Sequence, residues 1–304
     1  MRRWIVVVLA LSCPAWADKL PKDVKEAAKA YIKALTRQDA KGVIDALGEP
    51  ILRTAEAYAI DPATGQTPSR EEAIKKFLAL DDPNRKFAPD IGDGTALGAA
   101  TWDVTLTWPN GEKGRVRIAS GEGKKWKVVD IDGRAEERQA ALVAQAMRKI
   151  HNAERTWQGN DSDGNGQMDF WVGDVAGLFY HKLADGQSVG LLEEPYARAD
   201  KTGLAAYVKD VPEPHEGFWF RVVPTDAEGK AYAQDPDGDG KATTNPGRFA
   251  VCAYPATYGN PCTLTLILDE NGQVYGKDLG AKTLTGAEKW PNADPAKAGW
   301  VLVN

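Results

Sequence analysis

A long helical pattern followed by four strand-like runs constrains the fold of residues 135–304 more than any other feature. Apolar residues and one acid recur at helical spacing and predict a single helix from about residue 135 to 157: Val143, Met147, Ile150, Glu154 and Trp157. The strand-like runs that follow are GFWFRVVP, GRFAVCAYP, CTLTLILD and QVYGKDL. Asn271 and Gly272, between the last two runs, are typical of a type I′ hairpin turn. We therefore expect one long helix with a four-stranded antiparallel meander.

The first part of the chain has helical patterns before strand patterns. Residues 23–47 show apolar residues at 3.6-residue spacing, and Ser69 with Glu72 forms a capping box that begins another helix. Trp102, Val104, Leu106 and Trp108 then alternate with polar residues, which predicts a half-buried strand. Asn110-Gly111 predicts a two-residue hairpin turn after it. Asp103 falls on the other face of this strand, and we interpret it as an exposed carboxylate. The order predicts an α+β fold with helices on one face of an antiparallel sheet.

The N-terminus has the pattern of a secretory signal peptide. Arg2 and Arg3 precede an apolar run, and Ala15-Trp16-Ala17 is a small-x-small cleavage site. A competing interpretation, lipidation of Cys13, is disfavoured because Ala10-Leu11-Ser12 is a poor lipobox. No later run is long and apolar enough to cross a bilayer. We expect a periplasmic or secreted protein without a transmembrane helix after cleavage.

Charge and length limit the partners and the organisation. The formal net charge is -5, and it becomes -7 once Arg2 and Arg3 are removed with the signal. A chain with this balance is not expected to bind nucleic-acid phosphates through bulk charge. The length suggests two domains after the signal. We place the signal at residues 1–17, an α+β domain at 18–134 and a second domain at 135–304.

Two cysteines remain after cleavage of the signal. Cys252 and Cys262 flank a loop between two strand-like runs, and export to an oxidising space favours a disulfide between them. The alternative is a pair of reduced, buried thiols. Neither interpretation makes a cysteine a catalytic nucleophile, since a paired thiol is unreactive and a buried one is inert.

Two acidic loops have the spacing of calcium ligands. In NDSDGNGQMDF the oxygen-bearing residues at the first, third, fifth and ninth places are Asp161, Asp163, Asn165 and Asp169, with Gly166 at the sixth. The second loop offers Asp235, Asp237 and Asp239, with Gly240 at the sixth place. Both lack the acid of the twelfth place, where the first loop has Val172 and the second Pro246. The sequence therefore leaves two interpretations, structural calcium or plain solvated turns.

Four segments of the second half follow one another in order: EPHEGFWFRVVP, GRFAVCAYPATYG, TLTLILDENGQVYGKDLG and WPNADPAKAGWVLV. With these segments the second half resembles a bacterial secreted family, domain of unknown function 2950. That family is similar to the G-type pseudopilins of type II secretion, which implies a pilin-like head and a structural calcium. Pseudopilins polymerise through an N-terminal apolar helix, and here a cleaved signal and a whole domain occupy that position. Filament assembly is therefore not expected.

The first half, about residues 22–133, begins with AAKAYIKALTRQDAKGVIDAL and ends with KKWKVVDID. With these segments it resembles the nuclear-transport-factor-2-like, or SnoaL-like, superfamily, and the resemblance implies a cone of helices against a curved antiparallel sheet. Enzymes of the superfamily usually place His with Asp, or paired acids, in a pocket. This part of the chain contains no histidine.

These patterns predict an exported protein that is not an enzyme and has no catalytic residues. We expect an envelope-associated interaction or scaffolding module with calcium-stabilised loops and an envelope protein as its partner. The alternative is a small apolar ligand that is bound or converted in the cavity of the N-terminal domain.

Overall fold

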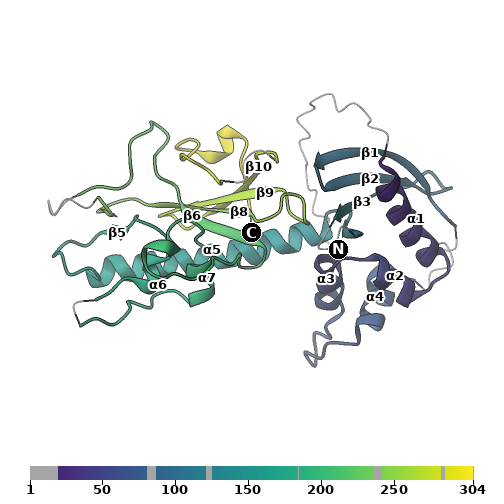
Figure 1. Cartoon of the computed structure of the whole chain (residues 1–304), viewed down its shortest axis with the longest axis horizontal. Helices are drawn as coiled ribbons and strands as arrows, with labels where there is room; N and C mark the ends of the chain where they lie inside the picture. The colour runs from purple at the N-terminus through teal and green to yellow at the C-terminus, as the bar shows by residue number, and fades with distance from the viewer. Residues whose placement is uncertain are drawn as a thin grey trace. The chain divides into compact units, whose positions relative to one another are not determined.

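The computed structural model describes residues 20–80, 87–120, 125–183, 185–235, 242–281 and 285–303. The predicted signal peptide and Cys13 lie outside these residues. The chain divides into two compact units. The N-terminal unit comprises the chain up to Gly48 together with Ala55–Asp132, and the C-terminal unit comprises Glu49–Thr54 together with the chain from Gly133. Helices and antiparallel sheets are present in an α+β arrangement, as expected (Figure 1).

Amphipathic helices supply one layer of the N-terminal unit. The helices of this part of the chain are α1 (Lys22–Thr36), α2 (Ala40–Ala46), α3 (Glu49–Ala59) and α4 (Arg70–Leu78). The predicted stripe of α1 is buried, with Val24 and Ala28 at 0% exposure. Helix α4 begins with the predicted capping box, in which Ser69 Oγ accepts the Glu72 N–H and a Glu72 carboxylate oxygen accepts the Ser69 N–H. Both sequence signals are confirmed.

The N-terminal sheet is an antiparallel meander in the order β1-β2-β3-β4. Its strands are β1 (Asp90–Gly98), β2 (Thr101–Thr107), β3 (Lys113–Ser120) and β4 (Trp126–Ile131). The predicted hairpin joins β2 to β3, but its turn is not a two-residue turn. Gly111 N–H bonds to Trp108 O, and Trp108 N–H bonds to Glu112 O, which leaves a three-residue loop. Pro109 accounts for the difference. A two-residue turn at Asn110-Gly111 would need an N–H on residue 109 to bond Glu112 O, and proline has no N–H, so Trp108 makes this bond instead.

The Asp103 carboxylate is covered, which corrects the prediction of an exposed group. Its side chain is 15% exposed, and it accepts hydrogen bonds from Arg117 Nε at 2.7 Å and Arg115 Nη1 at 2.9 Å. Arg115 also pairs with the fully buried Asp130 at 3.3 Å. Asp103 and Arg117 are directly opposite each other in the β2–β3 register. The alternation along β2 was predicted correctly, but the cross-strand arginines could not be assigned from β2 alone.

One long helix and a five-stranded sheet form the core of the C-terminal unit. Helix α5 (Arg134–Asn160) has the predicted stripe, with Val143, Met147, Ile150 and Trp157 at 0% exposure and Glu154 at 1%. It contacts β8 (Ala250–Pro255), β9 (Leu264–Asp269) and β10 (Val274–Asp278). In the described part of the chain, no helix is long and apolar enough to span a membrane.

The C-terminal sheet confirms the four predicted strands and adds a fifth. Its order is β11-β10-β9-β8-β6, with β6 at Phe218–Val222 and β11 at Val301–Leu302. A separate two-stranded ribbon pairs β5 (Phe170–Trp171) with β7 (Thr244–Asn245). The β9–β10 hairpin is present, with Gly272 at φ +74° and its N–H bonded to Asp269 O. Asn271 is not among the residues with positive φ, so this turn is not the expected type I′.

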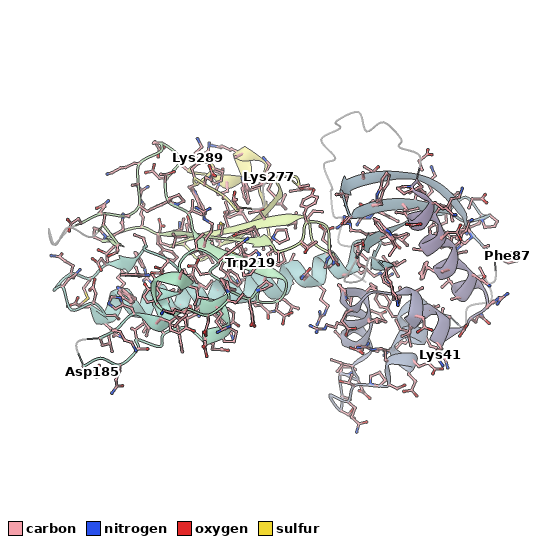
Figure 2. The ribbon with its side chains drawn as sticks, in the orientation of Figure 1. Lys41, Phe87, Asp185, Trp219, Lys277 and Lys289 are labelled. Carbon is pink, nitrogen blue, oxygen red and sulfur yellow. The ribbon has the colours of Figure 1, made fainter. Side chains whose placement is uncertain are left out.

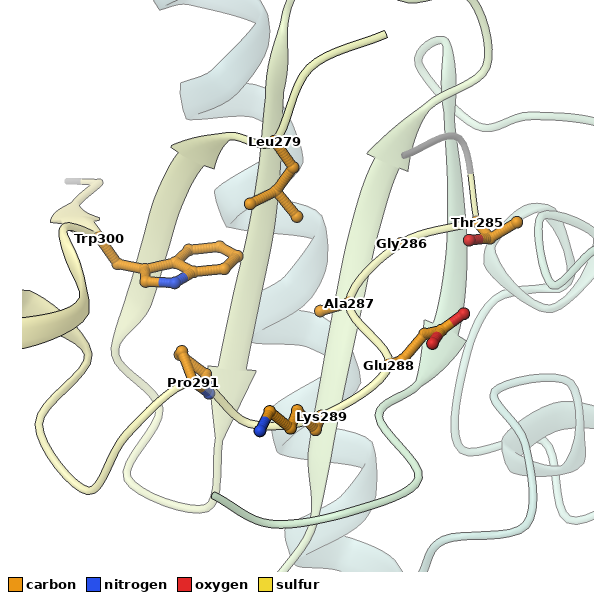
Figure 3. Close-up of a pocket in the computed structure, with 8 residues that line it drawn as sticks. All are labelled: Leu279, Thr285, Gly286, Ala287, Glu288, Lys289, Pro291 and Trp300. Carbon is orange, nitrogen blue, oxygen red and sulfur yellow. The ribbon is translucent and has the colours of Figure 1, made fainter. Parts of the chain in front are cut away.

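Coil covers the face of the C-terminal sheet opposite α5 (Figure 3). Arg221 Nη1 donates to Thr285 O at 2.8 Å, and Trp290 N–H donates to Thr225 O. Lys277, labelled in Figure 2, donates from Nζ to Ala298 O at 2.7 Å and ties the 3₁₀ turn Pro295–Ala298 to β10. The sheet is thus held between α5 and a layer of irregular chain, which also buries Trp290 and Trp300.

The predicted disulfide between Cys252 and Cys262 is absent, because the two residues are not at disulfide distance. Cys252 is opposite Ile267 in the β8–β9 register, and Cys262 precedes Ile267 by five residues. At about 3.3 Å per residue this offset is on the order of 15 Å, against less than about 7 Å between the Cα atoms of a disulfide. Both side chains are buried, and burial raises the pKa of the Cys252 thiol to about 12. The alternative of reduced, buried thiols fits the structure.

Candidate functional site

The acidic loop between α5 and β5 is the part of the structure in which the predicted ligand residues come together. Asp161, Gly164 and Gly166 have positive φ values of +45°, +71° and +81°, so the chain turns sharply where the helix ends. Gly166 N–H donates to both carboxylate oxygens of Asp161, at 3.0 and 3.2 Å. Gln167 N–H donates to Asn165 Oδ1 at 2.7 Å. Asp161 therefore caps the loop backbone.

The other two carboxylates of the loop face one side-chain amide. Asn165 Nδ2 donates to Asp163 Oδ2 at 3.1 Å and to Asp169 Oδ2 at 3.3 Å. Asp169 is 1% exposed. The second oxygen of each acid, Oδ1, is buried and has no hydrogen-bond partner among the described residues. Burial, and next the charge of Asp169, raise the pKa of Asp163 to about 6. The loop thus concentrates negative charge that the protein only partly compensates.

The side chains of this loop are not arranged as a complete metal centre. Within the described ranges, no group of three or more His, Cys, Asp and Glu side chains is arranged to hold a metal ion. Val172, at the twelfth place, is buried, and its N–H donates to Thr243 O beside the β5–β7 ribbon. Of the second predicted loop only Asp235 is described, and Asp237 and Asp239 lie outside the described residues. The first loop is therefore the candidate cation site.

Three further acids lie beyond this loop, and their carboxylates bind backbone. Glu154 Oε2 accepts Trp171 N–H at 3.1 Å, while Oε1 has no described partner. Asp174 accepts Gly177 N–H and, at 3.1 Å, the hydroxyl of Tyr207. Asp200 is 1% exposed and accepts backbone N–H groups from two segments. The sequence patterns did not identify Asp174 and Asp200, because neither belongs to a short motif.

Burial controls the protonation of two of these acids, Glu154 and Asp174. The pKa of Glu154 is raised well above its usual value because its carboxyl group is removed from water. Burial, and to a lesser extent the charge of Asp200, raise the pKa of Asp174 to about 6, although the hydrogen bond from Gly177 lowers it in part. The free energy of folding should therefore depend on pH between the unfolded and folded pKa values of these groups.

We expect Asp174→Asn to reduce the pH dependence of stability between about pH 4 and pH 6. A carboxyl whose folded pKa is raised contributes stability below its unfolded pKa, and this contribution is lost as pH rises through the folded pKa. A shift of about two units corresponds to up to about 3 kcal/mol. Thermal unfolding at several pH values measures the slope. Asp163 and Glu154 also have raised pKa values, so the slope should decrease without disappearing. The exposed Asp185→Asn is the control, and an unchanged slope in Asp174→Asn would contradict the assignment.

The chain contains one serine motif that was not among the predicted sites. Residues 186–190 read Gly-Gln-Ser-Val-Gly, which matches the G-x-S-x-G pattern of a nucleophile elbow. That elbow needs a strand-to-helix turn, whereas Ser188 forms an isolated antiparallel bridge with Lys182. Ser188 Oγ accepts a hydrogen bond from the exposed Lys182 Nζ at 3.0 Å. The motif is therefore part of a surface loop, without the backbone setting that the catalytic pattern requires.

Two pockets among the described residues lie in the C-terminal unit. The larger, about 480 Å³, is open and has a partly apolar wall, with the Trp300 indole between Leu279 and Pro291 (Figure 3). The smaller, about 260 Å³, is lined by four acids: Asp226, Glu228, Asp269 and Glu270. Arg248 also lines it, pairs with Asp226 at 2.8 Å and lies over the Tyr232 ring. The smaller pocket therefore carries a negative charge that suits a cationic group better than an anion.

Fold and site together define an α+β protein of two units in which the buried acids of the C-terminal unit bind mainly backbone groups. The chain belongs to the family described as proteins of unknown function (DUF2950), whose match covers residues 19–303. This confirms the family resemblance seen in the second half and extends it through the first. No curated protein and no solved structure matches the chain significantly.

Proposed function

We propose that the chain is an exported, non-enzymatic protein, periplasmic or secreted, that serves as an envelope-associated interaction or scaffolding module with a calcium-stabilised loop. In this proposal the N-terminal unit is a cone-like domain and the C-terminal unit is a pilin-like head. Two observations are compatible with a role outside catalysis. The half-buried carboxylate of Asp174 and the buried carboxylate of Asp200 bind backbone, and the serine motif lacks its elbow.

The observation that carries the interaction proposal is the β11 edge of the C-terminal sheet. Val301 and Leu302 are 67% and 47% exposed, although both are apolar. Within the described residues, β11 pairs only with β10. Val303 N–H bonds to Val274 O, so alternation along an antiparallel pair directs the N–H and C=O of Leu302 away from β10. An exposed edge of this kind accepts an added strand from a partner protein.

Site-specific cross-linking tests this proposal. A photoreactive amino acid placed at Leu302 should give a discrete adduct with an envelope protein, whereas the same group at the exposed Asp185 should give none. Val301→Lys, combined with the probe at Leu302, should abolish the adduct because a charge on the edge disfavours strand addition. Equal labelling at both positions, or none at Leu302, would refute the edge as an interaction site. Repeating the experiment with calcium and with chelator shows whether the partner needs the cation.

Both pockets described above lie in the C-terminal unit. The alternative proposal, a small apolar ligand that is bound or converted in the cavity of the N-terminal unit, draws no support from these two pockets.

A further inference from the structure

We propose that the loop Asp161–Asp169 binds one Ca²⁺ ion through Asp161, Asp163, Asn165 and Asp169, and that the Asn165 amide holds the place of the ion when the loop is empty. This inference rests on the calcium-stabilised loop of the proposed function. The three described carboxylates are not yet arranged to hold an ion, so the inference assigns both the ligands and the side-chain rearrangement that binding requires.

The first step of the argument is the burial of uncompensated oxygens. Oδ2 of Asp163 and Oδ2 of Asp169 contact the same amide nitrogen, so the two carboxylates converge on one point. Their Oδ1 atoms are buried and have no hydrogen-bond partner among the described residues. A plain solvated turn would leave such oxygens to water, but Asp169 is 1% exposed. Buried carboxylate oxygens without donors are costly, and a divalent cation compensates two of them at once.

The second step concerns the amide that stands between the acids. The N–H groups of Asn165 Nδ2 give partial positive charge to both carboxylates, which is the part that a cation plays with full charge. A side-chain amide carries oxygen and nitrogen on opposite sides, so a rotation of about 180° replaces these donors with Oδ1. The rotation ends the Gln167 N–H···Oδ1 bond and makes Asn165 a ligand. The same residue therefore stabilises the empty loop and completes the occupied one.

The third step concerns Asp161 and the choice of ion. Gly166 N–H contacts both oxygens of Asp161, and one of them is sufficient to hold it. The other is then available at the first place of the loop. All four ligands are oxygen donors, which favours a hard cation over zinc. Calcium accepts the irregular geometry of a loop without a twelfth-place acid, whereas magnesium requires near-ideal octahedral coordination.

Two variants with opposite expected effects test the site. Calcium at 100-fold above its Kd should raise the Tm of the wild type by about 5 °C or more relative to chelator. In Asn165→Asp the bridging donors are lost, so Tm in chelator should decrease while the calcium-induced increase becomes larger. In Asp169→Asn the repulsion is relieved, so Tm in chelator should be equal or higher while the calcium-induced increase is lost. Asp185→Asn, an exposed acid in another loop, should behave as the wild type.

Terbium provides a readout that is independent of unfolding. Trp171 is two residues after Asp169, so bound Tb³⁺ should give tryptophan-sensitised luminescence in the wild type, and added calcium should reduce it by competition. In Asp169→Asn, which lacks the site, we expect no luminescence that calcium can reduce. A calcium shift that persists unchanged in both loop variants would overturn this site while leaving calcium stabilisation by another loop intact. No shift in the wild type would overturn both claims about calcium. The cross-linking at Leu302 tests the interaction proposal independently of either calcium outcome.

Discussion

Trp157→Ala should lower the free energy of unfolding of the C-terminal unit by about 3–5 kcal/mol. Trp157 is fully buried near the end of α5, where the centroid of its ring lies 4.9 Å from that of Trp171 and 5.2 Å from that of His181. Its removal leaves a large cavity under the start of the β5–β7 ribbon, and the surrounding side chains can fill such a cavity only in part. Urea unfolding monitored by far-UV circular dichroism measures the effect.

Two other variants distinguish the loss of packing at Trp157 from a general sensitivity of this region to substitution. Trp157→Phe retains an aromatic ring and loses no hydrogen bond, since Nε1 of Trp157 has no partner among the described residues. We expect this variant to cost clearly less than Trp157→Ala. Met168→Ala, at a position 62% exposed in the adjacent loop, should stay within about 0.5 kcal/mol of the wild type. A cost below about 1 kcal/mol for Trp157→Ala would contradict the burial on which the core of this unit depends.

Asp200→Ala should cost about 3 kcal/mol or more, because one buried carboxylate organises two segments. Its Oδ2 accepts Val175 N–H at 2.7 Å and Ala176 N–H at 3.3 Å, at the start of the short helix α6 (Gly177–Tyr180). Its Oδ1 accepts Gly203 N–H at 2.8 Å, as well as the N–H and hydroxyl of Thr202. Alanine leaves these donors unpaired, and two of them, the N–H groups of Val175 and Ala176, are buried. Thermal unfolding and amide exchange at Val175 measure the loss.

The matched controls for Asp200 are one conservative and one exposed substitution. Asp200→Asn keeps one acceptor oxygen and should show an intermediate cost. Asp210→Ala removes a carboxylate whose side chain is 58% exposed and which pairs with Arg198 at 2.8 Å. Exposed pairs contribute about 0–1 kcal/mol, so this change should be small. If Asp200→Ala and Asp210→Ala had equal effects, Asp200 would not have the structural role assigned to it.

Local elements of this fold were predictable where a periodic pattern or a cap was present. The apolar stripe of α5, the capping box at Ser69 and the four strand-like runs after α5 all appear in the structure. Strand β1 was not predicted, because DIGDGTALG has three glycines and no regular alternation. It forms through pairing with β2, and a Cβ on Gly94 would overlap the Leu20 side chain. The close approach explains the glycine, but only the paired structure reveals it.

In the candidate site, too, some features were predictable from the sequence and others were visible only in the structure. Spacing alone placed Asp161, Asp163, Asn165 and Asp169 in one turn, because ligands two residues apart stay close in a tight loop. The spacing did not indicate that Asp169 is buried or that the Asn165 amide bridges two acids. The predicted disulfide between Cys252 and Cys262 was wrong, because the two residues are close in sequence but are offset by a large distance along the β8–β9 hairpin. Separation along the chain predicts distance within a turn but not along extended strands.

By itself, the sequence determined the α+β class, the long helix, the order of the C-terminal meander and the position of the acidic turn. These follow from side-chain periodicity and turn chemistry, which act over a few residues. Only the tertiary structure decided which acids are buried from solvent and which groups they contact. Glu154 accepts Trp171 N–H, Asp200 binds two segments, and Asp169 accepts a hydrogen bond from Asn165. Burial and partner choice depend on residues distant in sequence, and the energetic state of a carboxylate depends on both.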